Sequence, residues 1–193
     1  MPTPNRLHFN FDLKVKETFL FLLDQDFSVI EELPTLIRYK KDGIEVDVFH
    51  GRQSYEIGAG ISGFGTRYAM SEIIRAIDPE VARRYRDAVA TTPEAVASAL
   101  EELGSLMKSY GSRALSGDPQ FFSELGQQRK IWSEDYALDV LAEQVRPKAT
   151  DAFRRGDYAT AAKLYTRIRS RLSPAEIKKL ALAKARLGRI SGS

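Results

Sequence analysis

The spacing of hydrophobic residues in the first third of the chain predicts one helix followed by three antiparallel strands. From about residue 11 to residue 26, apolar residues recur at helical spacing, at Leu13, Phe19, Leu20, Leu22 and Leu23. Three runs that alternate between apolar and polar positions follow between residues 33 and 61. Asp42-Gly43 separates the first two runs and is typical of a tight hairpin turn, because glycine tolerates the positive φ that such turns need. The pattern therefore predicts a helix and a three-strand meander.

After residue 66 the apolar spacing becomes helical and stays so. Four helix starts have the same form, a capping side chain directly followed by proline: Asp78-Pro79, Thr92-Pro93, Asp118-Pro119 and Ser173-Pro174. The cap oxygen accepts a hydrogen bond from a free backbone N–H, and proline lacks only an N–H that has no partner at this position. Between the last two starts, we expect Pro147 to split one long helical stretch into two helices.

Together these patterns predict an α+β protein with two regions. Region 1–90 holds the N-terminal helix, the meander and short helices, and region 91–193 is mainly helical. Apolar residues make up 43% of the chain and charged residues 28%, which is ordinary for a chain that buries a core. The 193 residues are enough for one mid-sized domain or two small ones.

Composition also bounds the chemistry and the compartment. The chain has no cysteine, which removes disulfides, thiolate nucleophiles and cysteine metal sites, and this favours a reducing compartment. It has no run of about 18 apolar residues that could span a membrane, and its first residues lack the pattern of a secretory signal. We therefore predict a cytoplasmic protein that does not act at a membrane.

Charge is distributed very unevenly along the chain. Residues 146–193 contain 13 Lys/Arg and three Asp/Glu, whereas residues 1–145 contain 16 Lys/Arg and 23 Asp/Glu. The overall net charge of +3 conceals this difference. Such asymmetry is informative about partners, and it indicates an acidic one. Three classes stay open: another protein, nucleic acid, or this protein's own acidic half, either in the same chain or in a second copy.

Six basic residues fall opposite the apolar faces of the last two predicted helices. These candidate partner-binding residues are Lys163, Arg167, Arg171, Lys178, Lys179 and Arg186. Residues four apart lie on one helical face, so each helix presents a basic stripe. The stripes are interpreted either as a solvated face that only aids solubility, as a docking surface for an acidic protein, or as a phosphate-binding face. Tyr158 and Tyr165 fall on the apolar side, so no aromatic stacking platform accompanies the charge, which weakens the case for nucleic acid.

The C-terminal segment resembles a tetratricopeptide-type helical hairpin. The residues that carry the resemblance are Ala149, Ala152, Phe153, Gly156, Asp157, Tyr158, Ala162, Tyr165, Ile168 and Ser173 to Glu176. In that family a small residue packs between the two helices, and glycine and tyrosine lie at the corner. The resemblance covers about one repeat, within residues 134–188, and no second copy follows at a fixed period. Since such arrays need about three repeats for stability, it implies a single hairpin packed on the rest of the domain.

The whole layout is also similar to a group of uncharacterised bacterial α+β proteins. Their helix, meander and ending match here at Asp26-Phe27, where the family has Gly-Phe, and from Gly156-Asp157-Tyr158 to Leu180. Small proteins of this kind include immunity proteins, which neutralise a partner toxin. The resemblance therefore implies protein binding, with immunity as one form of it.

Three other groups of residues have a possible functional interpretation. Residues 58–63 spell G-x-G-x-x-G, but a dinucleotide site needs a helix directly after the third glycine and a parallel strand beyond it. We expect these glycines instead to permit a bulge or a close helix-on-strand approach. The only histidines, His8 and His50, are 42 positions apart, whereas a metal site needs at least three convergent ligands. Trp132 and Tyr136, four apart on a predicted helix, are interpreted as core residues rather than as an exposed interface anchor.

The leading hypothesis is a non-enzymatic bacterial protein that binds another protein through an acidic surface on that partner, with no cofactor. The alternative is a nucleic-acid-associated protein that uses the same six basic residues. A third hypothesis, a small enzyme, requires a pocket that gathers His50, Asp47 and Glu56.

Overall fold

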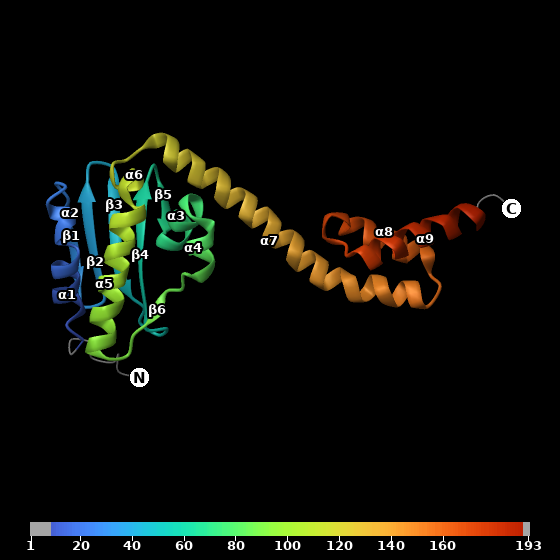
Figure 1. The fold of residues 1–193 in the computed structure, drawn as a ribbon, viewed down its shortest axis with the longest axis horizontal. Coiled ribbons are helices and arrows are strands. Elements are labelled where there is room, and N and C mark those ends of the chain that lie inside the picture. The colour runs from blue at the N-terminus through green and yellow to red at the C-terminus, as the bar shows by residue number, and fades with distance from the viewer. Residues whose placement is uncertain (1–8, 191–193) are drawn as a thin grey trace. The chain divides into compact units, whose positions relative to one another are not determined.

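The computed structural model describes residues 9–190, with side chains as far as residue 188 (Figure 1). It is α+β, as predicted, and its contacts divide the chain into unit 1, Met1–Arg129, and unit 2, Lys130–Ser193. The division falls within helix α7 (Pro119–Arg154). The boundary expected near residue 90 instead lies inside unit 1, because the helix that follows it, α5 (Pro93–Tyr110), packs against the sheet.

Unit 1 combines one antiparallel sheet with several helices. The helices are α1 (Phe11–Thr18), α2 (Leu20–Leu23), α3 (Met70–Ile77), α4 (Pro79–Arg84), α5, α6 (Ser112–Leu115) and the first part of α7. The strands are β1 (Ser28–Leu33), β2 (Leu36–Lys41), β3 (Ile44–His50), β4 (Glu56–Gly63), β5 (Thr66–Ala69) and β6 (Ala88–Val89). They form a sheet of order β1-β2-β3-β4-β5, in which β6 also pairs with β4.

The predicted meander corresponds to β2, β3 and β4. The structure adds β1, because Pro34-Thr35 turns the chain back at the point where the sequence indicated one continuous strand. It also adds β5 and β6, which are too short for their alternation to be recognised. The Asp42-Gly43 hairpin is confirmed, with Lys41 opposite Ile44, although the positive φ of 50° belongs to Asp42 rather than to the glycine.

All four predicted cap-proline helix starts are confirmed. Asp78, Thr92, Asp118 and Ser173 each accept a hydrogen bond from a backbone N–H two or three residues further on, at 2.9–3.3 Å. Each proline occupies the first helical position, where an N–H would have no helical partner. Local capping chemistry therefore fixes where α4, α5, α7 and α9 (Pro174–Ile190) begin.

The prediction that Pro147 splits its helix is wrong. Helix α7 runs without a break from Pro119 to Arg154 and contains Pro147. Val145 and Ala149, on either side of the proline, are both buried in the core of unit 2. Tertiary packing on both sides therefore holds the helix together although one backbone hydrogen bond is missing.

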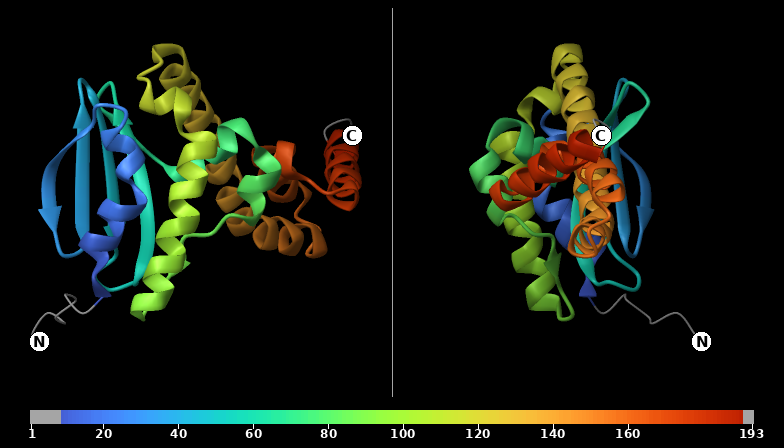
Figure 2. Two further views of the ribbon diagram at one scale, coloured as in Figure 1. Left: turned by 60° about the vertical axis from the view of Figure 1, so that its left-hand side comes forward. Right: turned by 90° about the vertical axis from the view of Figure 1, so that its right-hand side faces the viewer.

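The core of unit 1 lies between the sheet and three helices. Helices α1 and α5 pack side by side, α1 also contacts β2, and α3 and α5 contact β4 (Figure 2). Strand residues that point to this side are fully buried, including Ile37, Val46, Val48 and Ile61. From α1 and α2 the core receives Phe11, Val15, Phe19 and Leu22.

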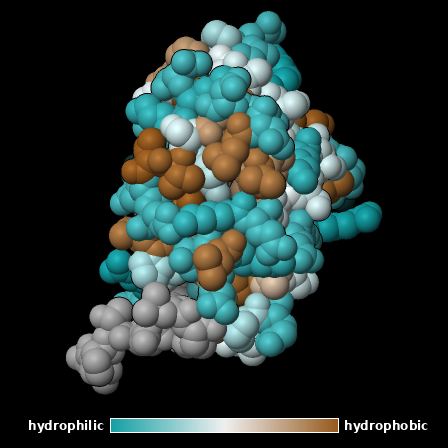
Figure 3. All heavy atoms as spheres, turned by 90° about the vertical axis from the view of Figure 1, so that its left-hand side faces the viewer, coloured by the Kyte–Doolittle hydropathy of each residue, from teal (hydrophilic) through white to brown (hydrophobic). Residues whose placement is uncertain are grey.

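Three leucines that the sequence placed on the buried face of the first helix, Leu13, Leu20 and Leu23, are exposed. The expected single helix is divided at Phe19 into α1 and α2, so the apolar face predicted from one continuous spacing is not maintained. Together with Ile30 and Leu33 of β1 they form apolar patches separated by polar atoms (Figure 3). A register irregularity at Ile30 and the acidic Glu31 and Glu32 interrupt β1, and such features oppose addition of a further strand at an edge.

The opposite face of the sheet carries ion pairs between neighbouring strands. Arg38 of β2 pairs with Glu31 of β1 at 2.6 Å. Arg67 of β5 donates two hydrogen bonds to Asp47 of β3, at 2.6 and 2.8 Å, and crosses over β4 to do so. It crosses at Gly60, where an added Cβ would come within 2.4 Å of the guanidinium carbon. A larger residue at this position would therefore displace the Arg67 side chain from its present path to Asp47.

Tyr39 of β2 has an unsatisfied hydroxyl, since it is fully buried and has no hydrogen-bond partner within the part of the chain that is described. Burial and the nearby Glu32 raise its pKa to about 12. We expect Tyr39→Phe to raise the free energy of unfolding by about 1 kcal/mol, because the cost of desolvating the hydroxyl disappears. The folded tyrosine resists ionisation, so wild-type stability should fall above pH 10. The fall should be smaller in the variant, where only other groups such as Tyr85, whose pKa is also raised by burial, still contribute. Urea unfolding at pH 7 and pH 11 tests both; a destabilised variant would contradict the prediction.

Unit 2 is built from the second part of α7, α8 (Tyr158–Arg167), a 3-10 turn (Arg169–Arg171) and α9. The corner between α7 and α8 contains Gly156, with φ of 77°, and Asp157, which accepts a hydrogen bond from Thr160 N at 3.0 Å. The core is made mostly of small residues, namely Ala149, Ala152, Ala161, Ala162 and Ala183, with Tyr165 and Leu180. Small side chains allow the helices to approach closely, as the sequence of this segment implied.

Candidate functional site: the basic surface of unit 2

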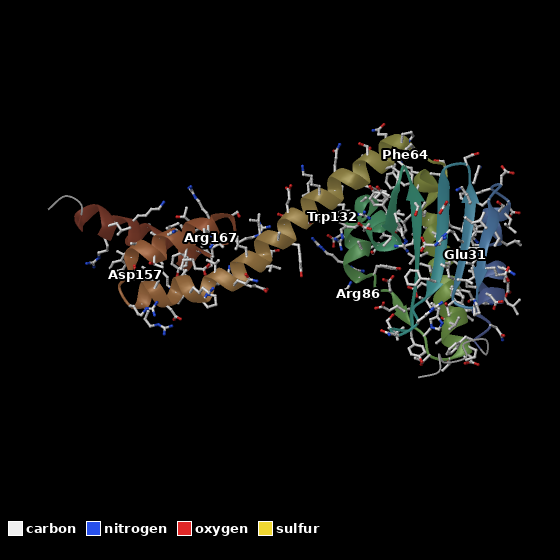
Figure 4. All side chains as sticks on the ribbon, turned by 180° about the vertical axis from the view of Figure 1, so that it is seen from behind. Glu31, Phe64, Arg86, Trp132, Asp157 and Arg167 are labelled. Carbon is white, nitrogen blue, oxygen red and sulfur yellow. The ribbon has the colours of Figure 1, made fainter. Side chains whose placement is uncertain are left out.

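Four of the six predicted partner-binding residues form what we call the basic surface: Lys163, Arg167, Lys178 and Arg186. All four are exposed, and Arg167 is labelled in Figure 4. Helix α8 places Lys163 and Arg167 opposite its buried Ala161 and Tyr165. Helix α9 buries Leu180 and Ala183, which leaves Lys178 and Arg186 outside.

No carboxylate within residues 9–188 pairs with any member of the basic surface. The reason is that most acids of unit 2 are already engaged. Lys130–Ser193 contains 14 Lys/Arg and seven Asp/Glu. Five of these acids pair with an arginine or cap a helix within the same unit: Asp135, Asp139, Asp151, Asp157 and Glu176. Unit 2 therefore carries a large positive charge that its own carboxylates do not neutralise.

Arg171 does not belong to this surface, which corrects the sequence-based assignment. Its side chain is half-buried, and it donates hydrogen bonds to Asp135 Oδ1 and Asp139 Oδ1 of α7, both at 2.6 Å. These two bonds, with Asp135 the larger contributor, raise the pKa of Arg171. Arg171 lies in the 3-10 turn after α8, so the spacing of four from Arg167 does not continue onto the same helical face.

Lys179 is also less accessible to a binding partner than predicted. It is half-buried on α9, and its Nζ lies 5.9 Å from the centre of the Phe153 ring of α7. The alkyl part of the side chain covers the core while the charge stays near an aromatic face. Lys179 therefore contributes to packing between α7 and α9 as well as to the positive charge.

One ion pair that stabilises the interior of unit 2 could not be recognised from the sequence. Arg146 Nε donates to Glu176 Oε1 at 2.8 Å, and Arg146 Nη2 donates to the carbonyl oxygen of Arg171 at 2.8 Å. Glu176 also accepts from Ser173 N at 2.7 Å, which completes the predicted capping box. The capping box was recognisable from sequence, but Arg146 lies 30 positions earlier and no local pattern connects the two.

The aromatic residues of α8 face the core, as the sequence predicted, but those at the start of unit 2 on α7 do not all do so. Tyr165 is fully buried and Tyr158 packs against the same core, so neither can stack with a base. On α7, however, Tyr136 is 71% exposed, which overturns its interpretation as a core residue, whereas Trp132 is half-buried. Leu141 is the first α7 residue in the hydrophobic clusters of unit 2, so Tyr136 lies before the packed part of the helix.

The three residues required for an enzyme site do not converge. His50 is buried among Phe9, Phe11 and Tyr55, with Nε2 2.9 Å from the carbonyl oxygen of Ala90. Asp47 lies three residues earlier on β3 and so points to the other face of the sheet. His8 lies outside the described residues, and the described part of the chain contains no group of three or more His, Asp or Glu suited to a metal ion.

The G-x-G-x-x-G segment is part of β4, in an antiparallel sheet. Gly58 lies under the ring of Phe49, and Gly63 lies under the ring of Phe122 on α7. An added Cβ at either position would come within 2.6 Å of a ring carbon. The expected close helix-on-strand approach is therefore present at Gly63.

Comparisons of this chain with known protein families, with curated proteins and with solved structures find no match. Among the described residues, no helix combines the length and the apolar character needed to cross a membrane.

Proposed function

We propose that this chain is a non-enzymatic, bacterial-type binding protein that recognises an acidic surface on another protein through Lys163, Arg167, Lys178 and Arg186. The observation that carries the proposal is the state of these side chains, which are exposed and lack carboxylate partners within the described unit. An immunity-type inhibitor acting in the cytoplasm is the form that agrees with the family resemblance. Complementary charge would speed association and select the partner.

The alternative is binding to nucleic acid through the same four cations. Phosphate contacts need only positive charge, which the basic surface supplies. Binding to single strands usually adds aromatic stacking, and the two tyrosines of α8 face the core instead. Protein binding therefore remains the better supported of the two proposals.

The first test is charge reversal on α8. A tagged full-length chain captures its partner from a bacterial lysate at low salt, and the partner is then purified. We expect the double variant Lys163→Glu/Arg167→Glu to bind it about 100-fold more weakly in calorimetry, since two attractive contacts become repulsive. The matched control is Lys148→Glu, an exposed cation on α7, which should bind within about twofold of wild type.

Two outcomes would count against this proposal. Equal affinity of the double variant and the wild type would remove the basic surface from the interface. Binding of a generic DNA duplex at about 50 mM salt, with an affinity that falls steeply as salt rises and is lost in the double variant, would favour the nucleic-acid alternative.

A further inference from the structure

Three tight turns at one end of the sheet border an open hollow of about 510 Å³. They are the β2–β3 turn, the β4–β5 turn and the turn between α6 and α7. The residues lining this apolar hollow include Ile44, Phe64 and Leu115 as apolar side chains and Lys41, Asp42 and Ser116 as polar ones. Ile44 and Leu115 are 7% and 4% exposed, so they form a floor beneath the turns and present little surface to the hollow. The volume lies in the range of small-ligand sites.

Phe64, labelled in Figure 4, lines the hollow and has an unusual backbone conformation. It is the first residue of the two-residue β4–β5 turn, has φ of 53° and is 65% exposed. Asparagine or glycine adopts this backbone conformation with less strain, and bulky residues are rare there. Its ring packs edge-on against the buried ring of Phe122, at 5.4 Å between centres, and the rest of the side chain is left exposed. Turn geometry therefore does not account for a phenylalanine at this position.

A second hollow of about 380 Å³ adjoins the first and shares Lys41, Leu115 and Ser116 with it. Lys41 and Lys108 are the charged residues among its lining, and Ser112 and Ser116 supply hydroxyls. Lys41 Nζ donates to the carbonyl oxygen of Gln25 at 2.8 Å and lies 3.8 Å from Asp26. Lys108 is exposed, with Nζ 4.8 Å from the Phe21 ring centre, and pairs with no carboxylate in the described part of unit 1. We call this second space the cationic hollow.

We infer that the two hollows form one binding site for an amphipathic carboxylate. The apolar body of the ligand lies against Ile44, Phe64 and Leu115, and its carboxylate lies in the cationic hollow near Lys108. Asp42 lines only the apolar hollow, so it repels an anion there and gives the ligand one orientation. This site lies on unit 1 and does not depend on the basic surface of unit 2.

The test uses 4-phenylbutyrate as the probe and the full-length, ¹⁵N-labelled protein. We expect saturable shifts of the backbone amide resonances of Gly43, Gly65 and Gly117, which line the apolar hollow. The uncharged analogue 4-phenylbutanamide should bind about three- to fivefold more weakly, because it lacks the ion pair with Lys108. A pentapeptide ending in phenylalanine, compared with its C-terminal amide, distinguishes a peptide terminus from a small free acid as the source of the carboxylate.

Two variants separate binding from folding. Lys108→Ala should reduce affinity for 4-phenylbutyrate to that of the amide without affecting the amide itself. Phe64→Asn should lose at least about tenfold in affinity for both probes while the urea midpoint stays near wild type, because asparagine fits the turn with less strain. The inference is overturned if the three glycine resonances do not move at 10 mM probe. It is also overturned if either variant binds as wild type.

Discussion

Tyr165→Ala is expected to lower the free energy of unfolding of unit 2 by about 4 kcal/mol, the largest effect among our predictions. Tyr165 is fully buried and is the largest side chain in a core made mostly of alanines. Its neighbours are too small to collapse into the cavity that the substitution leaves. Hydrogen exchange followed residue by residue should show loss of protection in α8 and α9, with protection in the sheet of unit 1 retained.

Tyr136→Ala is the matched control for this experiment. It removes the same side chain from a helix of the same unit, at a position where the ring is 71% exposed. Its effect should stay within about 0.5 kcal/mol of wild type. The account of the core of unit 2 is wrong if the two variants have equal effects, or if Tyr165→Ala leaves exchange in α8 unchanged.

Among the effects on stability, Glu176→Ala should produce the second largest, a loss of about 2 kcal/mol in the free energy of unfolding. The substitution removes the hydrogen bond from Ser173 N at the start of α9 and leaves Arg146 without its carboxylate. The expected loss is smaller than for a fully buried ion pair, because the Arg146 side chain is 41% exposed and solvent screens its charge. Thermal unfolding at pH 7 measures the difference, and Glu143→Ala, which changes an exposed acid on α7, provides the control.

The contribution of Glu176 should also depend on pH. Burial alone raises the pKa of its carboxyl, but the bonds from Ser173 and Arg146 outweigh burial and lower it below the model-compound value of 4.5. A folded-state pKa below the unfolded one means that the stabilisation is complete above about pH 4.5 and is lost as pH falls through the folded value. The difference in free energy of unfolding between wild type and Glu176→Gln should therefore become smaller as the pH falls. A difference that stays constant from pH 7 to pH 3 would show that the charge of Glu176 does not contribute to stability.

Features of the fold that depend on a few neighbouring residues could be predicted from the sequence. The four cap-proline pairs and the Asp42-Gly43 hairpin were found because each is decided by local hydrogen bonds and turn geometry. The continuity of α7 through Pro147 could not be predicted, because packing by α8 and α9 decides it. Strand β5 was missed for a related reason, since pairing with β4 organises only four residues.

The candidate site could be predicted where helical periodicity applies. Lys163 and Arg167 lie one turn apart on α8, and the structure places both outside. Arg171 could not be assigned correctly, because the end of α8 and the acids of α7 that bind Arg171 depend on tertiary structure. The two hollows of unit 1 have no counterpart in the sequence pattern, since segments far apart in the chain line each of them.

The alanine-rich interior of unit 2 has a consequence for detecting whatever binds it. Methyl groups bury little apolar area, so helices joined this way have a small reserve of folding free energy. A partner that binds only the folded state raises the free energy of unfolding, by about 2.7 kcal/mol when the free partner is at one hundred times its dissociation constant. A binding partner should therefore be detectable by a rise in the melting temperature of these helices, before any complex has been isolated.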